Sequence, residues 1–151
     1  FTSHHIITDT EIFSRYEILL ENYVKTIHIE AKTLYSMVEQ QFMPALLHYT
    51  DTLSSSIAEK KAVADLPCTA ETALLKDMSA AYESLYTLSE KLAADTAEAE
   101  GLTDSAKASF FYHDTIIKDM DDIRAVADKA EVKLPKEFLP YPSYEEMLFY
   151  V

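Results

Sequence analysis

The chain has 151 residues, of which 48% are hydrophobic and 11% aromatic; this is enough for a buried core and argues against intrinsic disorder. With 26 acidic and 13 basic side chains, the formal charge is −13, which disfavours binding to a polyanionic nucleic acid. One glycine and five prolines leave few residues for β-turns, so the composition favours an all-α fold.

The first helix is predicted to begin at Thr8, because Glu11 three residues later completes a capping box. Apolar residues then recur at steps of three, four or seven, the spacing of one helical face. Pro44 lacks a backbone donor and clashes with the Gln40 carbonyl, so we expect a kink there and a helix that fades near residues 65–67. The apolar face comprises Phe13, Tyr16, Leu20, Tyr23, Ile27, Leu34, Val38, Phe42, Ala45 and Tyr49.

Two further long helices are predicted. Thr69 is the expected N-cap of the second, and the sole glycine, Gly101, is expected to end it. Thr103 is the expected cap of the third. The apolar face of the second comprises Leu74, Met78, Ala81, Leu85, Leu88 and Leu92, and that of the third comprises Tyr112, Ile116, Met120, Ile123, Ala127 and Ala130.

Three prolines at positions 135, 140 and 142 predict an extended Pro-rich C-terminal tail. Ser143 and Glu146 form a second capping box, so a short helix over residues 144–149 should end the tail. The helix lengths fit an antiparallel bundle of three long helices in a single helical domain, residues 1–151, with the first helix kinked at Pro44. We expect the tail from Phe138 to Phe149 to cover the early apolar face around Phe13.

The sequence predicts no catalytic, cofactor or metal site. Phosphate-binding loops need several glycines, and only Gly101 is present. A di-metal site in a helical bundle needs Glu three residues before His, but Lys25, Ala45 and Phe110 precede His28, His48 and His113. His113 is interpreted as a partly buried, hydrogen-bonded residue rather than a base.

Cys68 cannot form a disulfide within one chain, which is typical of a reducing cytosol. A reactive role would need a histidine partner in space, so we interpret Cys68 as a structural residue. No apolar run reaches the roughly 18–20 residues that span a bilayer, so no membrane partner is expected. The tyrosines are interpreted as core residues, except in the tail at residues 141–150, where core and interface remain open.

Both ends of the chain carry recognisable sequence motifs. The first is Arg15-Tyr16-Glu17, then Lys25-Thr26-Ile27, Ile29-Glu30-Ala31 and Pro44-Ala45 with Tyr49 four residues on. The second is Leu134-Pro135, Pro140-Tyr141-Pro142, Tyr144 and Leu148-Phe149. Together they resemble the C-terminal helical region of type III glutamine synthetases.

The resemblance implies a non-catalytic C-terminal region of a larger cytoplasmic ligase, and the start at Phe1 rather than Met fits a fragment. The parent enzyme would join ammonia to glutamate with ATP and Mg²⁺ or Mn²⁺, in stacked rings. The expected partners are the catalytic domain of the same chain and neighbouring subunits of a homo-oligomer.

No catalytic residue is carried over from that family. Arg15 and Arg124 are the only arginines, too few for a clamp on anionic substrates. Arg15, Glu17, Lys25 and Glu30 are interpreted as structural or interface groups. The alternative hypothesis is a free-standing acidic helical interaction or scaffold module.

Overall fold

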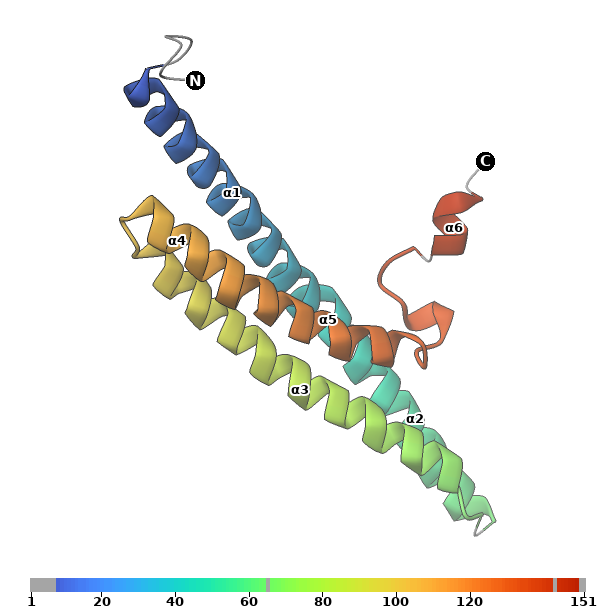
Figure 1. The fold of residues 1–151 in the computed structure, drawn as a ribbon. Helices are drawn as coiled ribbons and strands as arrows, with labels where there is room; N and C mark the ends of the chain where they lie inside the picture. Colours follow the sequence, from blue (N-terminus) through green and yellow to red (C-terminus); the bar gives the residue numbers. More distant parts are fainter. Residues whose placement is uncertain (1–7, 65, 143, 150–151) are drawn as a thin grey trace. The chain divides into compact units, whose positions relative to one another are not determined.

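The computed structural model describes residues 8–64, 66–142 and 144–149, and within them every regular element is a helix (Figure 1). The all-α prediction is therefore confirmed. No described helix is long and apolar enough to cross a membrane. The elements are α1 (Asp9–Met37), η2 (Val38–Phe42), α2 (Met43–Val63), α3 (Thr69–Glu100), α4 (Ser105–Phe111), η3 (Tyr112–Ile116), α5 (Ile117–Glu131), η4 (Lys136–Phe138) and α6 (Tyr144–Leu148).

The first long helical stretch is kinked, as predicted, at a π-helical segment directly before Pro44. The N–H of Met43 donates to the carbonyl of Val38, five residues back rather than four. Pro44 has no N–H, so the carbonyl of Gln40 lacks its usual partner four residues on. A wider turn here accommodates that missing bond.

The predicted start of the first helix is confirmed, whereas two other caps differ from expectation. The Thr8 N–H donates to Glu11 Oε2 at 2.8 Å, and the Glu11 N–H donates to Thr8 Oγ1 at 3.3 Å. Asp104, not Thr103, caps α4: its Oδ1 accepts from the N–H groups of Ala106 and Lys107, each at 3.0 Å. Thr69 is the first residue of α3 rather than its cap.

Gly101 follows the last residue of α3, as predicted, but without the left-handed conformation of a C′ glycine. A positive φ of 42° occurs instead at Cys68, before the start of α3. The capping residue predicted for the last helix, Ser143, lies outside the described residues. The helix itself, α6, is present.

The contacts group the chain into two compact units. The first unit comprises Phe1–Tyr35 and Lys91–Asp121, and the second comprises Ser36–Glu90 and Asp122–Val151. Each unit therefore joins segments that are far apart in the sequence. The prediction of a single domain stays a prediction.

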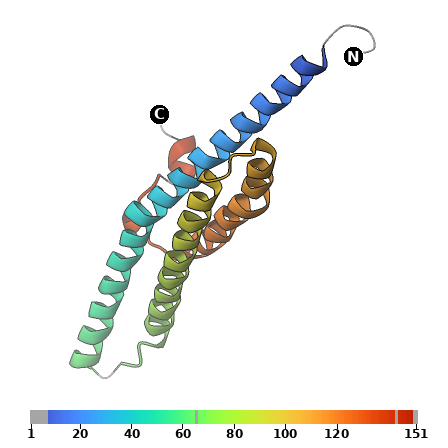
Figure 2. The ribbon, with the colours of Figure 1, turned by 90° about the vertical axis from the view of Figure 1, so that its left-hand side faces the viewer.

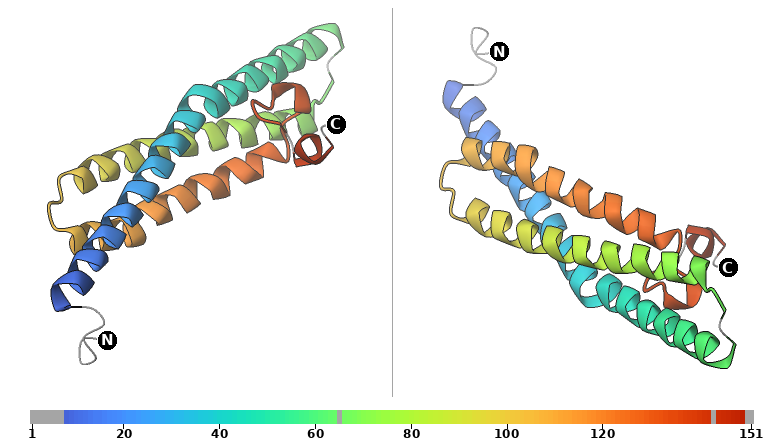
Figure 3. Two further views of the ribbon diagram at one scale, coloured as in Figure 1. Left: turned by 90° about the horizontal axis from the view of Figure 1, so that it is seen from above. Right: turned by 90° about the horizontal axis from the view of Figure 1, so that it is seen from below.

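In the first unit, α1, the end of α3 and the segment from α4 to the start of α5 share one core. The end of α3 and α4 lie side by side, joined by residues 101–104 (Figure 3). Its buried apolar residues are Ala31, Leu92, Ala99, Ala108, Tyr112 and Ile116.

In the second unit, α2 and the first part of α3 form a helical hairpin (Figure 2). Lys60 Nζ of α2 lies 2.9 Å from Glu71 Oε1 of α3, and Ser89 of α3 hydrogen-bonds Glu39 in η2, the segment before α2. Lys133 Nζ, from the segment after α5, reaches Asp77 Oδ2 at 2.8 Å. Buried apolar residues of this unit include Phe42, Leu46, Tyr49, Met78, Leu85 and Ile123. Met78 and Leu85 belong to the apolar face predicted for the second helix, and Ile123 belongs to that predicted for the third.

Candidate interaction surfaces

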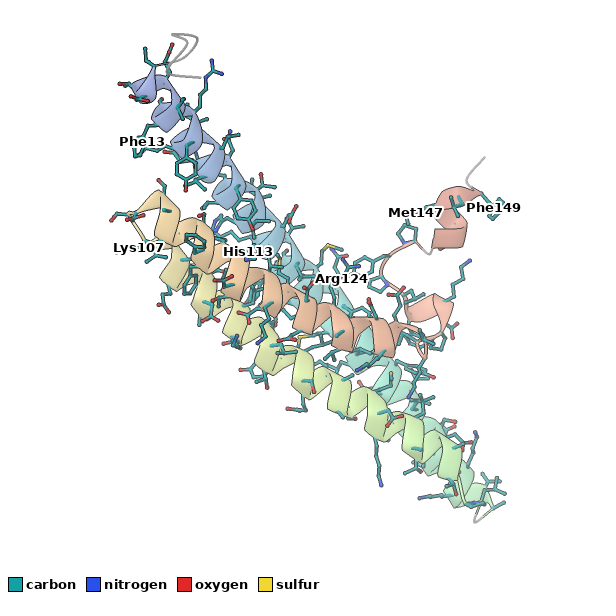
Figure 4. All side chains as sticks on the ribbon, viewed as in Figure 1. Phe13, Lys107, His113, Arg124, Met147 and Phe149 are labelled. Atoms are coloured by element: carbon teal, nitrogen blue, oxygen red, sulfur yellow. The ribbon has the colours of Figure 1, made fainter. Side chains whose placement is uncertain are left out.

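The first turns of α1 present large apolar side chains to solvent. Phe13 is 62% exposed and Leu19 is 68% exposed, and Ile12, Tyr16 and Ile18 are also exposed. Phe13 projects from α1 in Figure 4. Exposed apolar patches of this kind mark interaction sites in soluble proteins. We call Ile12, Phe13, Tyr16 and Leu19 the α1 apolar face.

The α1 apolar face continues into a groove of about 340 Å³ between α1 and the α4–η3 segment. Leu20 and Tyr23 line one side of it, and Ser109, Phe110 and His113 line the other. Phe110 is 66% exposed. The hydroxyl of Tyr23 is buried and has no hydrogen-bond partner among the described residues, which costs free energy unless a further group supplies one.

The C-terminal segment carries a second apolar surface, around a hollow of about 960 Å³. Met147 and Phe149, both labelled in Figure 4, are exposed there. Lys136 Nζ lies 2.9 Å from Glu146 Oε1, and this ion pair links η4 to α6. The other lining residues are Leu139, Tyr141 and Pro142.

Tyr141 and Phe138 anchor this segment to the kinked helix within the second unit. The Tyr141 hydroxyl donates to the carbonyl of Met37 at 3.0 Å, and its ring stacks on Phe42 at 6.4 Å between centroids. Phe138 packs on Tyr49 at 5.1 Å. Burial raises the pKa of the Tyr141 hydroxyl, so it remains a donor. The described tail contacts thus fall on Met37, Phe42, His48 and Tyr49, all within the second unit. The expectation that the tail covers the early apolar face around Phe13, in the first unit, stays a prediction.

A chain of polar groups links three segments of the first unit. The hydroxyl of Tyr112 lies 2.9 Å from His28 Nδ1, and His28 Nε2 lies 3.3 Å from Glu100 Oε1. Lys32 Nζ lies 2.8 Å from the same Glu100 oxygen, and this hydrogen bond lowers the pKa of Glu100. Burial raises the pKa of the Tyr112 hydroxyl. These contacts position the side chains, and none of them suggests a nucleophile.

A second polar cluster joins α3 to α5 in the first unit. Asp119 is 2% exposed, and its Oδ1 accepts a hydrogen bond from Lys91. Lys91 also lies 3.3 Å from Asp95 Oδ2. The other oxygen of Asp119, Oδ2, accepts no hydrogen bond from a described residue. Burial therefore raises the pKa of Asp119 despite the lysine, while the hydrogen bond to Asp119 raises the pKa of Lys91.

Asp119 was not predicted as a site residue, although its position in the sequence carries a signal. Its position falls between Ile116 and Ile123 at steps of three and four, on the apolar face of the third helix. A carboxylate on such a face needs a partner when the helix packs.

Each of the residues that the sequence did single out has its own surroundings, and the expectation that His113 is partly buried is wrong, because its side chain is 69% exposed. His113 is exposed, with Nδ1 2.8 Å from Asp114 Oδ1, and the ring of His48 packs on Phe138. Cys68 is buried. In the described ranges, no group of three or more His, Cys, Asp or Glu side chains could hold a metal ion.

The charged residues of the N-terminal sequence motif, which carries the family resemblance, all lie on the surface of α1. Arg15, Glu17 and Glu30 are exposed, and Lys25 Nζ lies 3.4 Å from Glu21 Oε2. Arg15 and Glu17 flank the α1 apolar face, whereas Lys25 and Glu30 lie further along α1. They are suited to the rim of an interface.

Comparison with known proteins gives a consistent result. Residues 1–61 match the family model described as glutamine synthetase C-terminal domain. The chain is 43% identical over 150 residues to a glutamine synthetase from Butyrivibrio fibrisolvens, covering 99% of this chain and 21% of that protein. It is 25% identical over 155 residues to a type-3 glutamine synthetase from Dictyostelium discoideum, covering 99% of this chain and 21% of the relative.

A glutamine synthetase from Bacteroides fragilis is 23% identical over 149 residues, covering 95% of this chain and 20% of its own length. The chain therefore spans about a fifth of the length of the curated relatives that it matches. The resemblance inferred from the two ends of the sequence is confirmed, and it extends through the acidic middle as well.

Proposed function

We propose, from a resemblance to glutamine synthetases that covers the whole chain, that this chain is the non-catalytic C-terminal helical domain of such an enzyme. Its role is to support the assembly and the catalytic core of a glutamate–ammonia ligase. The observation that carries the proposal is that the α1 apolar face falls within residues 1–61, the part that matches the domain. An exposed apolar face of this kind indicates a surface for a partner.

The partners in this proposal are the catalytic domain of the same polypeptide and neighbouring subunits of a homo-oligomer. ATP and Mg²⁺ or Mn²⁺ would bind the catalytic domain, not this chain. The proposal includes a cytoplasmic location and, across the two units, the antiparallel three-helix arrangement. The lone buried Cys68 and the scarcity of arginine are compatible with this role.

Co-expression tests the proposal. This chain would be produced with the remaining four-fifths of the Butyrivibrio fibrisolvens enzyme as a separate tagged polypeptide. We expect the two to co-purify and the complex to form glutamine from glutamate, ammonia and ATP. The chain alone should show no ligase activity.

Leu19→Ser in the α1 apolar face should weaken co-purification, because it places a polar group in the contact. Ser14→Ala, an exposed change on the same helix, is the matched control and should leave it unchanged. If the two variants co-purify with the partner polypeptide equally well, the α1 apolar face is not part of the interface. Failure of the unmodified pair to associate would favour a free-standing acidic interaction module instead.

A further inference from the structure

The first turns of α1 and the start of α4 form two apolar walls in the first unit. Toward its start, α1 diverges from α4 and extends past the turn between α3 and α4 (Figure 1 and Figure 2). Phe13 on α1 is 62% exposed and Phe110 on α4 is 66% exposed. The groove of about 340 Å³ between α1 and the α4–η3 segment adjoins both walls, and we call it the α1–α4 groove.

The dimensions of this surface fit a helix. Ile12, Tyr16, Leu19 and Tyr23 recur at steps of four, three and four, so they share one side of α1. At about 1.5 Å per residue, this side is about 17 Å long, which corresponds to roughly three turns of a partner helix. Both walls are helical, so the side chains of a third helix can pack between their ridges. An extended peptide would need an unpaired strand edge, and every regular element in the described part of the chain is a helix.

The charged residues around this surface indicate the sign of the partner. Asp9 and Glu17 lie beside the α1 apolar face, and Asp114 lines the α1–α4 groove. The nearby basic residues are Arg15 and Lys107. Acids are in excess here and in the whole chain, whose formal charge is −13, so a partner with basic flanks is favoured. The same excess disfavours an anionic membrane surface.

The curated relatives contain a source for such a helix. They are about five times as long as this chain, and the matching family is a C-terminal domain, so most of their length precedes it. In such a protein, the preceding polypeptide joins α1 through residues 1–8, which span at most about 30 Å when extended. A tether of this length gives effective concentrations of about millimolar, so even a weakly binding helix would occupy the groove.

We propose that the α1 apolar face and the α1–α4 groove bind an amphipathic helix with an apolar stripe and lysine or arginine on its flanks. The apolar stripe covers Phe13 and Phe110, and the basic flanks face Asp9, Glu17 and Asp114. In the parent enzyme this helix belongs to the catalytic part of the same polypeptide, and for that source the inference rests on the proposed function.

The test is a titration of the full chain against a fluorescein-labelled peptide, followed by fluorescence anisotropy. The peptide has about 14 residues, with leucine at steps of three and four and lysine elsewhere. We expect saturable binding with a dissociation constant on the order of 10 µM. Absence of saturation up to about 200 µM would overturn the proposal.

Two control peptides separate the apolar stripe from the charge. One has the same composition in an order that breaks the leucine stripe, and the other has glutamate in place of lysine. Each should bind at least tenfold more weakly, because the first cannot cover both walls and the second is repelled by the acidic rim. Equal binding of either control peptide would contradict the proposed partner.

Variants locate the site on the chain. Phe13→Ser and Phe110→Ser change the two walls, and each should weaken the leucine–lysine peptide at least tenfold. Ile29→Ser is the matched control: Ile29 is 63% exposed on α1, but about 3.6 residues per turn place it on nearly the opposite side from Phe13. Equal binding by all three variants would show that the peptide binds elsewhere and would contradict the proposal.

Vesicles of phosphatidylcholine test lipid as the occupant. We expect the chain to stay in the supernatant when the vesicles are sedimented. Co-sedimentation that Phe13→Ser abolishes would show that the α1 apolar face binds lipid, and would contradict the helix.

The peptide titration and the co-expression experiment separate this inference from the proposed function. If the peptide binds as expected but the unmodified pair does not co-purify, the proposed function fails and the groove remains a helix-binding site. If the pair co-purifies but the peptide does not bind, only the present inference fails.

Discussion

At the scale of single residues, Asp119 combines deep burial with an incomplete set of hydrogen bonds. Lys91 satisfies one carboxylate oxygen, and no described residue satisfies the other. Lys91 favours the ionised acid, whereas burial favours the neutral acid, and burial is the larger effect on the pKa of Asp119. The neighbouring carboxylate of Asp95 acts in the same direction as burial.

From the raised pKa of Asp119 we predict how the free energy of unfolding changes with pH. A group whose pKa is raised on folding stabilises the folded state at low pH. This stabilisation is fully present below the pKa of the unfolded state, 3.8 for an ordinary aspartate, and is lost as the pH rises through the pKa of the folded state. The free energy of unfolding of the wild type, minus that of Asp119→Asn, should therefore fall as the pH rises above 3.8.

Urea unfolding followed by circular dichroism between about pH 4 and pH 7 measures that difference. Asp121→Asn, an exposed change two residues away, is the control and should keep the pH dependence of the wild type. A difference that stays constant would mean that the lysine offsets burial, and one that grows with pH would mean that the lysine outweighs it; either result would contradict the prediction.

At the scale of elements, the apolar periodicity predicted most of what the structure shows. Steps of three and four placed Leu85, Leu92 and Ile123 on buried faces, because the helical repeat fixes which residues share a side. Thr103 and Asp104 are adjacent and both cap helices well, so the sequence alone did not separate them. Pro44 marked the first π-helical segment, but no proline or glycine marks the second, at η3.

Leu85 tests the core of the second unit. It is fully buried, with 0% exposure, in the first part of α3. Leu85→Ala should lower the free energy of unfolding by roughly 2–5 kcal/mol, because it removes buried methyl groups and leaves a cavity. Glu83→Ala, an exposed change on the same helix, should stay within about 0.5 kcal/mol. Chemical denaturation of both variants checks the contrast, and a loss under about 1 kcal/mol for Leu85→Ala would mean that its site collapses or is not core.

At the scale of the whole molecule, the contacts of the C-terminal tail could not be predicted from local patterns. Phe138 and Tyr141 meet aromatic partners about ninety to a hundred residues earlier in the chain. Helix periodicity indicates which residues are buried but not which distant segment buries them. The same limit applies to the surfaces: the sequence indicated an apolar face on α1 but not the groove beside Phe110.

Removing residues 135–151 should destabilise the chain and promote aggregation. The deletion uncovers Phe42 and Tyr49 and removes two aromatic pairs, each worth about 0.5–1.5 kcal/mol beyond their buried area. A loss of roughly 2 kcal/mol corresponds to a fall in Tm of about 4–8 °C for a chain of this size.

Calorimetry and light scattering measure the two effects of the deletion. Leu148→Ser, which changes an exposed tail residue, is the control and should leave the Tm unchanged. A deleted chain with the Tm and the monomer content of the full chain would show that the tail contributes no cover to Phe42 and Tyr49.

The π-helical segment η3 also has a consequence for sequence evolution. The N–H of Ile117 bonds to the carbonyl of Tyr112, so this turn encloses one residue more than an α-helical turn. A gene that lost one codon there could close an ordinary α-turn while the helix on either side of it keeps the same faces toward its neighbours. We therefore expect alignments of relatives to place a one-residue gap between positions 112 and 116 more readily than elsewhere in this helix.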